Sequence, residues 1–149
     1  MSWNQDKSVK LSKFCVHLFM VIYVAVIFTA PWLFRLLIQV RGDDMKTLPL
    51  FLITIYLAAV PAAGALWDLR RLLFNISGDA VFIPQNVAIL RRLSWYCIAA
   101  GLICLPGVFF YPVFLIVSSA AAFVGLILRV VKNVFAQAVQ IKTENDFTI

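Results

Sequence analysis

Four long apolar blocks occupy most of this chain, and the polar residues lie in the short stretches between them. The blocks run approximately over 14–34, 48–67, 95–110 and 113–128, and none of them contains Asp, Glu, Lys or Arg. An α-helix rises about 1.5 Å per residue, so about 20 apolar residues match a hydrocarbon core about 30 Å thick. A water-soluble domain would need polar helix faces, which these blocks lack. The pattern therefore predicts an all-α fold, an integral membrane four-helix bundle.

Composition supports this fold class and limits the number of domains. Hydrophobic residues make up 63% of the 149 residues and charged residues 13%, and the mean hydropathy is +0.95. We expect a single transmembrane domain over 1–149. The first block exceeds the ~7–15-residue apolar region of a signal peptide, so we expect a retained span. The formal net charge is +6, but the cations flank the blocks, so membrane topology explains them and no direct nucleic-acid binding is expected.

The distribution of Lys and Arg predicts which way the chain faces. Four spans place the N-terminal arm, the 68–92 loop and the 129–149 tail on one side, and these segments hold ten of the thirteen Lys and Arg residues. Short segments rich in Lys and Arg remain in the cytoplasm. Both termini are therefore predicted to be cytoplasmic. The protein is expected to be multi-pass, with the lipid bilayer as its partner.

The two external connections carry turn signals. The first, over 35–47, contains Gly42-Asp43-Asp44, and the second contains Leu105-Pro106-Gly107 followed by Tyr111-Pro112. Because the last two blocks are short, a re-entrant hairpin is an alternative to two full spans. The basic residues after Leu128 favour a full crossing.

Spans two and four are predicted to extend into the cytoplasm as amphipathic helices. Leu69–Phe74 continues span two before the stop signal of 75–79, and the apolar residues after Leu128 keep helical spacing. Asn86 is expected to cap the helix that enters span three. Two arginine pairs are typical of snorkelling anchors, with a partner-binding or anionic-lipid site as the alternative: Arg70, Arg71, Arg91 and Arg92.

The small and aromatic residues predict how the spans pack. Pro61 predicts a kink in span two. Small residues four apart let helix backbones approach closely, and such pairs are Cys97/Gly101, Ser118/Ala122 and Ala121/Gly125. Aromatic residues at the block ends are expected to form an interfacial belt, and they are Trp32, Trp67, Trp95 and Tyr111.

Polar groups that could carry out chemistry are scarce. Proton relays and ion pathways use ionisable residues inside the membrane, and the four blocks contain none of the four charged types. Small multidrug exporters are similar in size and span number but depend on an embedded glutamate, whereas the one glutamate here is Glu144, in the tail. His17 is the sole histidine, and a single histidine cannot form a metal site without cysteine or acidic partners. Cys97 and Cys104 are too far apart on one helix to form a disulfide. We expect no catalytic residue, no metal and no cofactor, and so no enzyme.

The C-terminal residues Lys142-Thr143-Glu144-Asn145-Asp146-Phe147-Thr148-Ile149 differ in composition from the spans. They resemble the ending of a family of small bacterial four-span membrane proteins of unknown function, which is Lys-x-Glu-Asn-Asp-Leu-Thr-Ile-like, with Phe147 in place of Leu. The central loop is similar to the same family. It carries Asp68-Leu69-Arg70, Gly78 with Phe82 four residues on, Asn86-Val87 and Leu90-Arg91, but Pro84 stands near a position that is more often polar or acidic in the family.

The resemblance implies a bacterial inner-membrane location and a class of partner. Members of that family are often encoded beside a small helix-turn-helix regulator of the Cro type, which indicates a membrane protein that holds or controls the regulator. The leading hypothesis is thus a non-enzymatic membrane protein whose cytoplasmic face binds such a regulator. The candidate partner contacts are Asn86, Arg91, Arg92, Glu144, Asn145, Asp146, Thr148 and Ile149.

Other interpretations of the sequence are open. The tail acids are free to pair with the arginines of the loop, which would close the bundle and leave no docking site. A small transport or immunity-type protein that acts on a hydrophobic compound is the alternative function, and a membrane enzyme is the third. A monomer and a homodimer fit the small-residue helix faces equally well.

Overall fold

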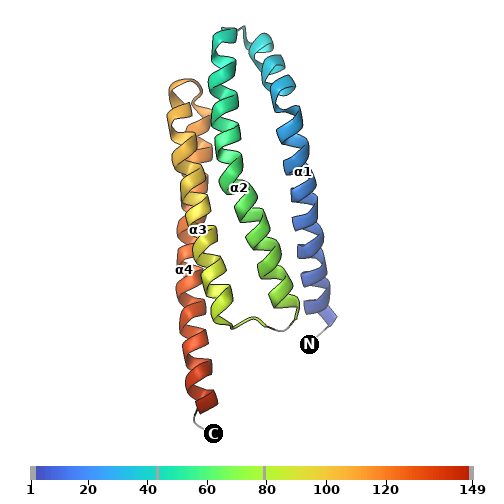
Figure 1. The fold of residues 1–149 in the computed structure, drawn as a ribbon, viewed down its shortest axis with the longest axis vertical. Helices are drawn as coiled ribbons and strands as arrows, with labels where there is room; N and C mark the ends of the chain where they lie inside the picture. The colour runs from blue at the N-terminus through green and yellow to red at the C-terminus, as the bar shows by residue number, and fades with distance from the viewer. Residues whose placement is uncertain (1–2, 43, 79, 148–149) are drawn as a thin grey trace.

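A computed structural model describes the backbone of residues 3–42, 44–78 and 80–147, and within these ranges the side chains of residues 7–145. Its four long helices are α1 (Trp3–Arg41), α2 (Leu48–Ser77), α3 (Pro84–Cys104) and α4 (Val113–Phe147). Short 3₁₀ segments, η1 (Met45–Thr47) and η2 (Leu105–Phe109), lie in the two turns at one end. The chain runs up and down twice, so both termini lie at the opposite end (Figure 1). No strand occurs in the described ranges.

All four helices are long and apolar enough to cross a membrane. The spanning candidates are Lys7–Arg41, Met45–Ser77, Pro84–Phe109 and Val113–Asn145. The structure confirms the predicted all-helical fold, with four helices long and apolar enough to span a membrane. The last two blocks form two helices of spanning length rather than a short hairpin, because η2 confines the helix break to the turn.

The two turns form where the helix-breaking glycine and proline residues predict them. Gly42 ends α1 with a φ of +72°, a left-handed conformation that glycine adopts at no steric cost. Asp44 then caps η1, because its carboxylate accepts a hydrogen bond of 3.0 Å from the Lys46 backbone N–H. In the second turn, the Tyr111 N–H donates to the Gly107 carbonyl at 2.9 Å. Gly107 lies against the Phe114 ring, where an added Cβ would come within 2.8 Å of the ring atoms.

The segment over 68–92, expected as the cytoplasmic connection with helix at both of its ends, is mostly helical. α2 continues to Ser77 and α3 begins at Pro84, so residues 78–83 alone connect them. The predicted extension of α2 is therefore confirmed as helix, and α4 likewise remains helical through Phe147. Pro61 lies near the middle of α2, and Figure 1 shows this helix changing direction near its middle.

The helices pack in the order in which they occur in the sequence. α1 packs on α2, α2 on α3, and α3 on α4 (Figure 1). In the described part of the chain, the α1 backbone makes close approaches to α2 and η1 and none to α3 or α4. The arrangement is therefore open along one side.

Two separate cores hold the ends of the molecule together. At the turn end, Phe51 packs on Tyr111 and Phe114, with ring centres 4.4 Å and 5.5 Å apart. Tyr111 is 5% exposed, so its predicted place in an interfacial belt is wrong, whereas three tryptophans are exposed as expected: Trp32, Trp67 and Trp95. At the other end the core consists of Leu72, Ile89, Leu90 and Leu93.

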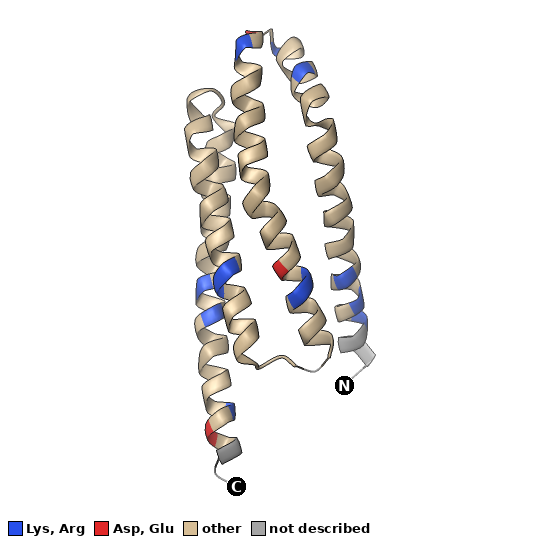
Figure 2. Ribbon diagram, viewed as in Figure 1, with Lys and Arg blue, Asp and Glu red and all other residues tan. Residues whose placement is uncertain are grey.

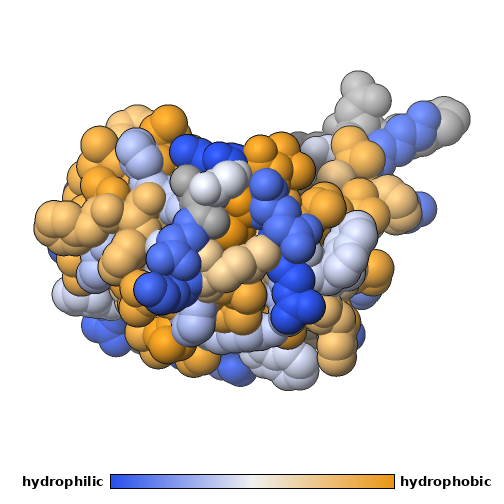
Figure 3. Space-filling model, turned by 90° about the horizontal axis from the view of Figure 1, so that it is seen from above, coloured by the Kyte–Doolittle hydropathy of each residue, from blue (hydrophilic) through white to orange (hydrophobic). Residues whose placement is uncertain are grey.

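The outer surface is mostly apolar. Large hydrophobic side chains are exposed along all four helices. The end-on view in Figure 3 shows apolar residues over much of the rim, with hydrophilic residues near the middle of the end that faces the viewer. A surface of this kind fits lipid as its solvent, since a soluble protein rarely exposes so much contiguous apolar area.

Candidate functional site

An ion pair joins α2 to α3 near the end that holds both termini. The Asp68 carboxylate on α2 is 5% exposed and faces the Arg92 guanidinium on α3. Arg92 Nε donates to Asp68 Oδ2 at 2.7 Å, and a second guanidinium nitrogen donates to Oδ1 at 2.9 Å. Two parallel hydrogen bonds of this kind fix both the distance and the relative rotation of the two helices. Arg92 was expected to contact a partner, but the structure pairs it within the chain.

Sequence reasoning missed this pair because it treated Arg92 as a headgroup-level anchor or a partner contact and assigned no partner to Asp68. A signal was nevertheless present. Asp68 follows the second block directly, and Arg92 precedes the third block by three residues. When two consecutive helices run antiparallel, residues at mirrored distances from the connection lie at the same depth. The only acidic residue directly beside the end of a block was thus opposite an arginine.

Asn86 organises the connection between α2 and α3. It is fully buried, and its side-chain amide donates to the carbonyls of Ala80 and Val81 at 2.8 Å each. Its side-chain oxygen accepts a hydrogen bond of 2.8 Å from the Asn75 amide. The prediction that Asn86 caps the helix is wrong: α3 begins two residues earlier, at Pro84, and Asn86 lies inside the first turn. Its polar atoms are used internally, so it offers none to a partner.

Small residues bring α3 and α4 into direct backbone contact. An added Cβ at Gly101 would lie 3.0 Å from the Ser118 carbonyl oxygen, and one at Gly125 would lie 2.9 Å from Ile98 Cγ1. The Ser94 hydroxyl donates to the Gly125 carbonyl at 2.8 Å, and the Ser118 hydroxyl donates to the Gly101 carbonyl at 2.7 Å. The predicted close approach is confirmed, and the two reciprocal hydrogen bonds make α3 and α4 a well-joined pair.

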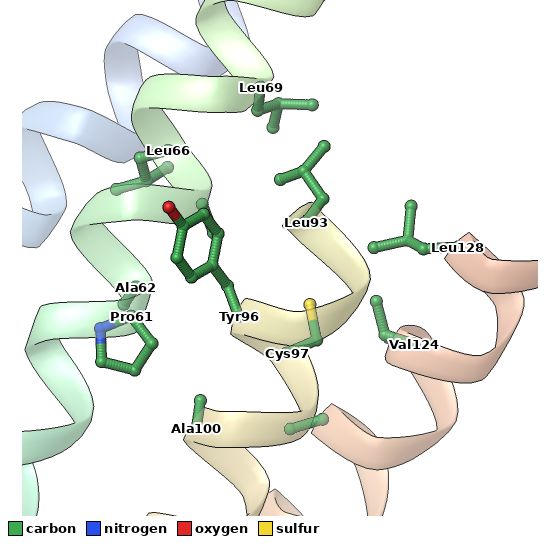
Figure 4. Close-up of a pocket in the computed structure, with 12 residues that line it drawn as sticks. Pro61, Ala62, Leu66, Leu69, Leu93, Tyr96, Cys97, Ala100, Val124 and Leu128 are labelled. Atoms are coloured by element: carbon green, nitrogen blue, oxygen red, sulfur yellow. The ribbon is translucent and has the colours of Figure 1, made fainter. Parts of the chain in front are cut away.

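An apolar groove lies between α2, α3 and α4 (Figure 4). Its volume is about 420 Å³, and its wall is entirely apolar. The Tyr96 ring also packs against Gly64, where an added Cβ would lie 2.9 Å from the ring. The lining residues are Pro61, Ala62, Ala65, Leu66, Leu69, Leu93, Tyr96, Cys97, Ala100, Ala121, Val124 and Leu128. Such a groove suits an apolar ligand and holds no acid–base pair.

The predicted partner contacts are separated in the structure. Arg91 is exposed on the first turns of α3, whereas Glu144 and Asn145 are exposed on the last turns of α4. The end of α4 lies beyond the connection between α2 and α3 (Figure 1). Asp146, Thr148 and Ile149 lie outside the residues whose side chains are described. The interpretation in which the tail folds back onto the loop arginines is wrong, because α4 remains helical through Phe147.

Within the described residues, no group of three or more His, Cys, Asp or Glu side chains is placed to hold a metal ion. His17 is exposed, with its Nδ1 2.8 Å from the Lys13 carbonyl oxygen. The three cysteines are free thiols. Three features can therefore support a function. They are the ion pair of Asp68 and Arg92, the apolar groove between α2, α3 and α4, and the end of α4 that extends beyond the other helices.

Comparison with known proteins identifies one family. Residues 7–149 match the model of DUF2975, a protein family of unknown function. No curated protein and no solved structure matches the chain. The match confirms the expected membership of an uncharacterised family, while the tail motif, the neighbouring regulator and a bacterial origin remain predictions.

Proposed function

The chain belongs to the DUF2975 family, whose function is unknown, and from this premise we propose that it is a non-enzymatic, multi-pass membrane protein that binds a cytoplasmic partner. The proposed partner is a small helix-turn-helix regulator, and the proposed docking site is the projecting end of α4. One observation carries the proposal. α4 continues beyond the rest of the bundle as an exposed helix (Figure 1).

The length of α4 supports a role outside the bilayer. A helix of 35 residues is about 52 Å long, whereas the hydrocarbon core is about 30 Å thick. Residues 141–145 are all exposed, and Ile141 is an exposed apolar residue among them. A helix gains most of its stability from packing of an apolar face. A partner that covers Ile141 would supply that packing.

The sequence places one cation, Lys142, and two acids, Glu144 and Asp146, near the end of α4, an acidic excess that favours a basic partner surface. Glu144 lies twelve residues after Lys132, which is about 18 Å along a helix. This separation exceeds the Debye length of about 8 Å at physiological ionic strength, so the cations of the bundle are screened from a partner docked there. A regulator held through its basic face would be kept from DNA phosphates, because the same cations would serve both contacts.

The orientation is part of the proposal. We place both termini in the cytoplasm of a bacterium, with the protein in the inner membrane. Figure 2 shows Lys and Arg gathered toward the end of the molecule that holds both termini, with few at the turn end. This distribution supports the N-in, C-in arrangement through the positive-inside rule.

Site-specific photo-crosslinking in native membranes tests the proposal. A photoreactive residue replaces Ile141, and a second protein carries it at Phe109, which is exposed at the turn end. We expect the first position to capture a helix-turn-helix protein and the second to capture none. Capture should disappear with Glu144→Lys and persist with Gln137→Ala, a substitution at an exposed position two turns earlier.

Two results would contradict docking through the end of α4. Each variant is first shown to be membrane-inserted by alkaline extraction. If the inserted proteins capture no DNA-binding protein at Ile141, or if Glu144→Lys captures the same regulator as the unsubstituted protein, docking through the end of α4 is rejected.

The apolar groove supports a second candidate, a small transport or immunity-type protein that acts on a hydrophobic compound. The groove volume of about 420 Å³ matches a small apolar molecule. Filling the groove with Ala100→Trp should then abolish protection against such a compound while leaving regulator capture unchanged. If Ala100→Trp protects cells as well as the unsubstituted protein does, this candidate is rejected.

A further inference from the structure

Three cations from two helices gather on the outer face of α3 and α4. Arg91 and Lys132 line one pocket of about 250 Å³, together with Pro84, Val87 and Ala88. Arg129 lies with its guanidinium carbon 5.0 Å from the centre of the Trp95 ring, and Trp95 is one turn after Arg91 on α3. We refer to Arg91, Arg129 and Lys132 as the α3–α4 basic cluster.

The cluster has no acidic partner among the side chains that the structure describes. The carboxylates described there are engaged elsewhere. Asp68 pairs with Arg92, Glu144 accepts a hydrogen bond from Gln140 at 3.0 Å, and Asp44 lies 3.8 Å from Lys46 at the turn end. Like charges held on neighbouring helix turns repel one another. An anion bound between them would remove this repulsion.

The surface next to the cluster is apolar and belongs to the same two helices. On α3, Trp95 is 56% exposed and Leu102 lies exposed two turns further on. On α4, Leu126 is exposed one turn before Arg129. Both helices are long and apolar enough to span a membrane. The order from cation to tryptophan to aliphatic side chain is the order from headgroup to acyl chain in a lipid leaflet.

We propose that the α3–α4 basic cluster binds the phosphate of an anionic phospholipid, with an acyl chain along Trp95, Leu102 and Leu126. A phospholipid satisfies the cations and covers the apolar residues at once, whereas free phosphate satisfies the cations alone. Basic pockets between helices on the cytoplasmic side of membranes are suited to acidic headgroups. This site is independent of the partner proposed for the end of α4.

Tryptophan quenching by brominated lipid tests the site directly. The full-length protein carries Trp95 as its sole tryptophan after Trp3, Trp32 and Trp67 are each replaced by Phe. It is reconstituted in phosphatidylcholine vesicles that contain either dibrominated phosphatidylglycerol or dibrominated phosphatidylcholine. We expect the anionic probe to quench Trp95 at much lower mole fraction, because headgroup binding holds its brominated chain against the ring.

Charge variants locate the binding. Each cation near a membrane surface contributes about a fivefold gain in affinity for anionic lipid. Arg91→Gln with Lys132→Gln should therefore reduce the preference for phosphatidylglycerol about 25-fold. Arg129 is left in place because it lies on the Trp95 ring. Arg91→Lys with Lys132→Arg keeps both charges and should keep most of the preference, which separates charge from a loss of folding.

The matched control is Arg70→Gln with Arg71→Gln on α2, which removes the same charge and should leave the preference unchanged. An equal loss in this control would overturn the proposal in favour of general surface attraction. Equal quenching by the two brominated lipids would overturn it by showing ordinary interfacial anchoring of Trp95. If millimolar inorganic phosphate abolishes the preference, the cluster is a site for a soluble anion and the lipid assignment is rejected.

Discussion

The ion pair between Asp68 and Arg92 predicts that removing one of its two charges costs more stability than removing both. Arg92→Met removes the guanidinium but leaves the carboxylate of Asp68, whose side chain is 7% exposed. A buried charge that loses its partner keeps its desolvation cost and gains nothing in return. Asp68→Leu with Arg92→Met removes both charges. We therefore expect the single Arg92→Met variant to be less stable than the double variant.

The magnitude follows from the burial of the two partners. Breaking a fully buried pair costs about 3–5 kcal/mol, and breaking an exposed pair costs about 0.2–1 kcal/mol. Here the Asp68 side chain is buried, but the Arg92 side chain is 45% exposed. The two hydrogen bonds of 2.7 Å and 2.9 Å share one guanidinium. We expect a cost of about 2 kcal/mol for Arg92→Met, which is about a 30-fold change in the unfolding equilibrium.

Unfolding in mixed micelles with a denaturing detergent, followed by far-ultraviolet circular dichroism, provides the free energies for a double-mutant cycle. Arg92→Lys should lose part of the stability, since an ammonium cannot make the two parallel hydrogen bonds. Arg91→Met, at the exposed neighbouring position, should change the unfolding free energy by less than about 0.5 kcal/mol. A coupling energy below about 0.5 kcal/mol would refute the reasoning, because it would place the pair among surface ion pairs.

Three further predictions concern the connection, the α3–α4 interface and the topology. Asn86→Ala should lower the free energy of unfolding by about 1–3 kcal/mol, because buried backbone carbonyls lose their donor, whereas Gln85→Ala at an exposed position should have little effect in the same detergent-unfolding assay. Gly125→Val should cost about 1–3 kcal/mol by forcing α3 and α4 apart at Ile98, with Ala122→Val as the exposed control; equal unfolding free energies of the two variants would contradict the close packing. Reporter fusions should show both termini in the cytoplasm and the 42–44 turn outside, and a reporter active on opposite sides at the two termini would exclude four crossings.

Hydropathy predicted the helices and turns of this chain because one physical requirement dominates there. In hydrocarbon, every backbone polar group must be satisfied internally, so an apolar block of sufficient length becomes a helix. Gly42 and the Pro106-Gly107 pair then determine where the helices end. The small residues Gly101 and Gly125 predicted the α3–α4 contact on similarly general grounds, since backbones approach closely only where side chains are absent.

Local sequence patterns did not predict the contacts between helices. The helical extension after Asp68 was predicted from its own spacing, but its packing through Leu72 against Ile89 and Leu90 was not. The Asn86 side chain was assigned to its own helix end because capping is local, whereas its partners lie on the preceding connection. Neither contact is encoded in a local pattern, so each required knowledge of which helices are neighbours. The groove was missed for the same reason.

The specific polar contacts are distributed unequally, and this has a consequence for function. α2, α3 and α4 are joined by the ion pair of Asp68 and by hydroxyl-to-carbonyl hydrogen bonds from Ser94 and Ser118. α1 is joined to α2 by two tyrosine hydroxyls, at 2.9 Å from Tyr23 to the Ala59 carbonyl and at 3.2 Å from Tyr56 to the Ile27 carbonyl. The groove, the basic cluster and the projecting end of α4 all belong to the three-helix part. Both proposed sites therefore lie on helices that these hydrogen bonds join to one another.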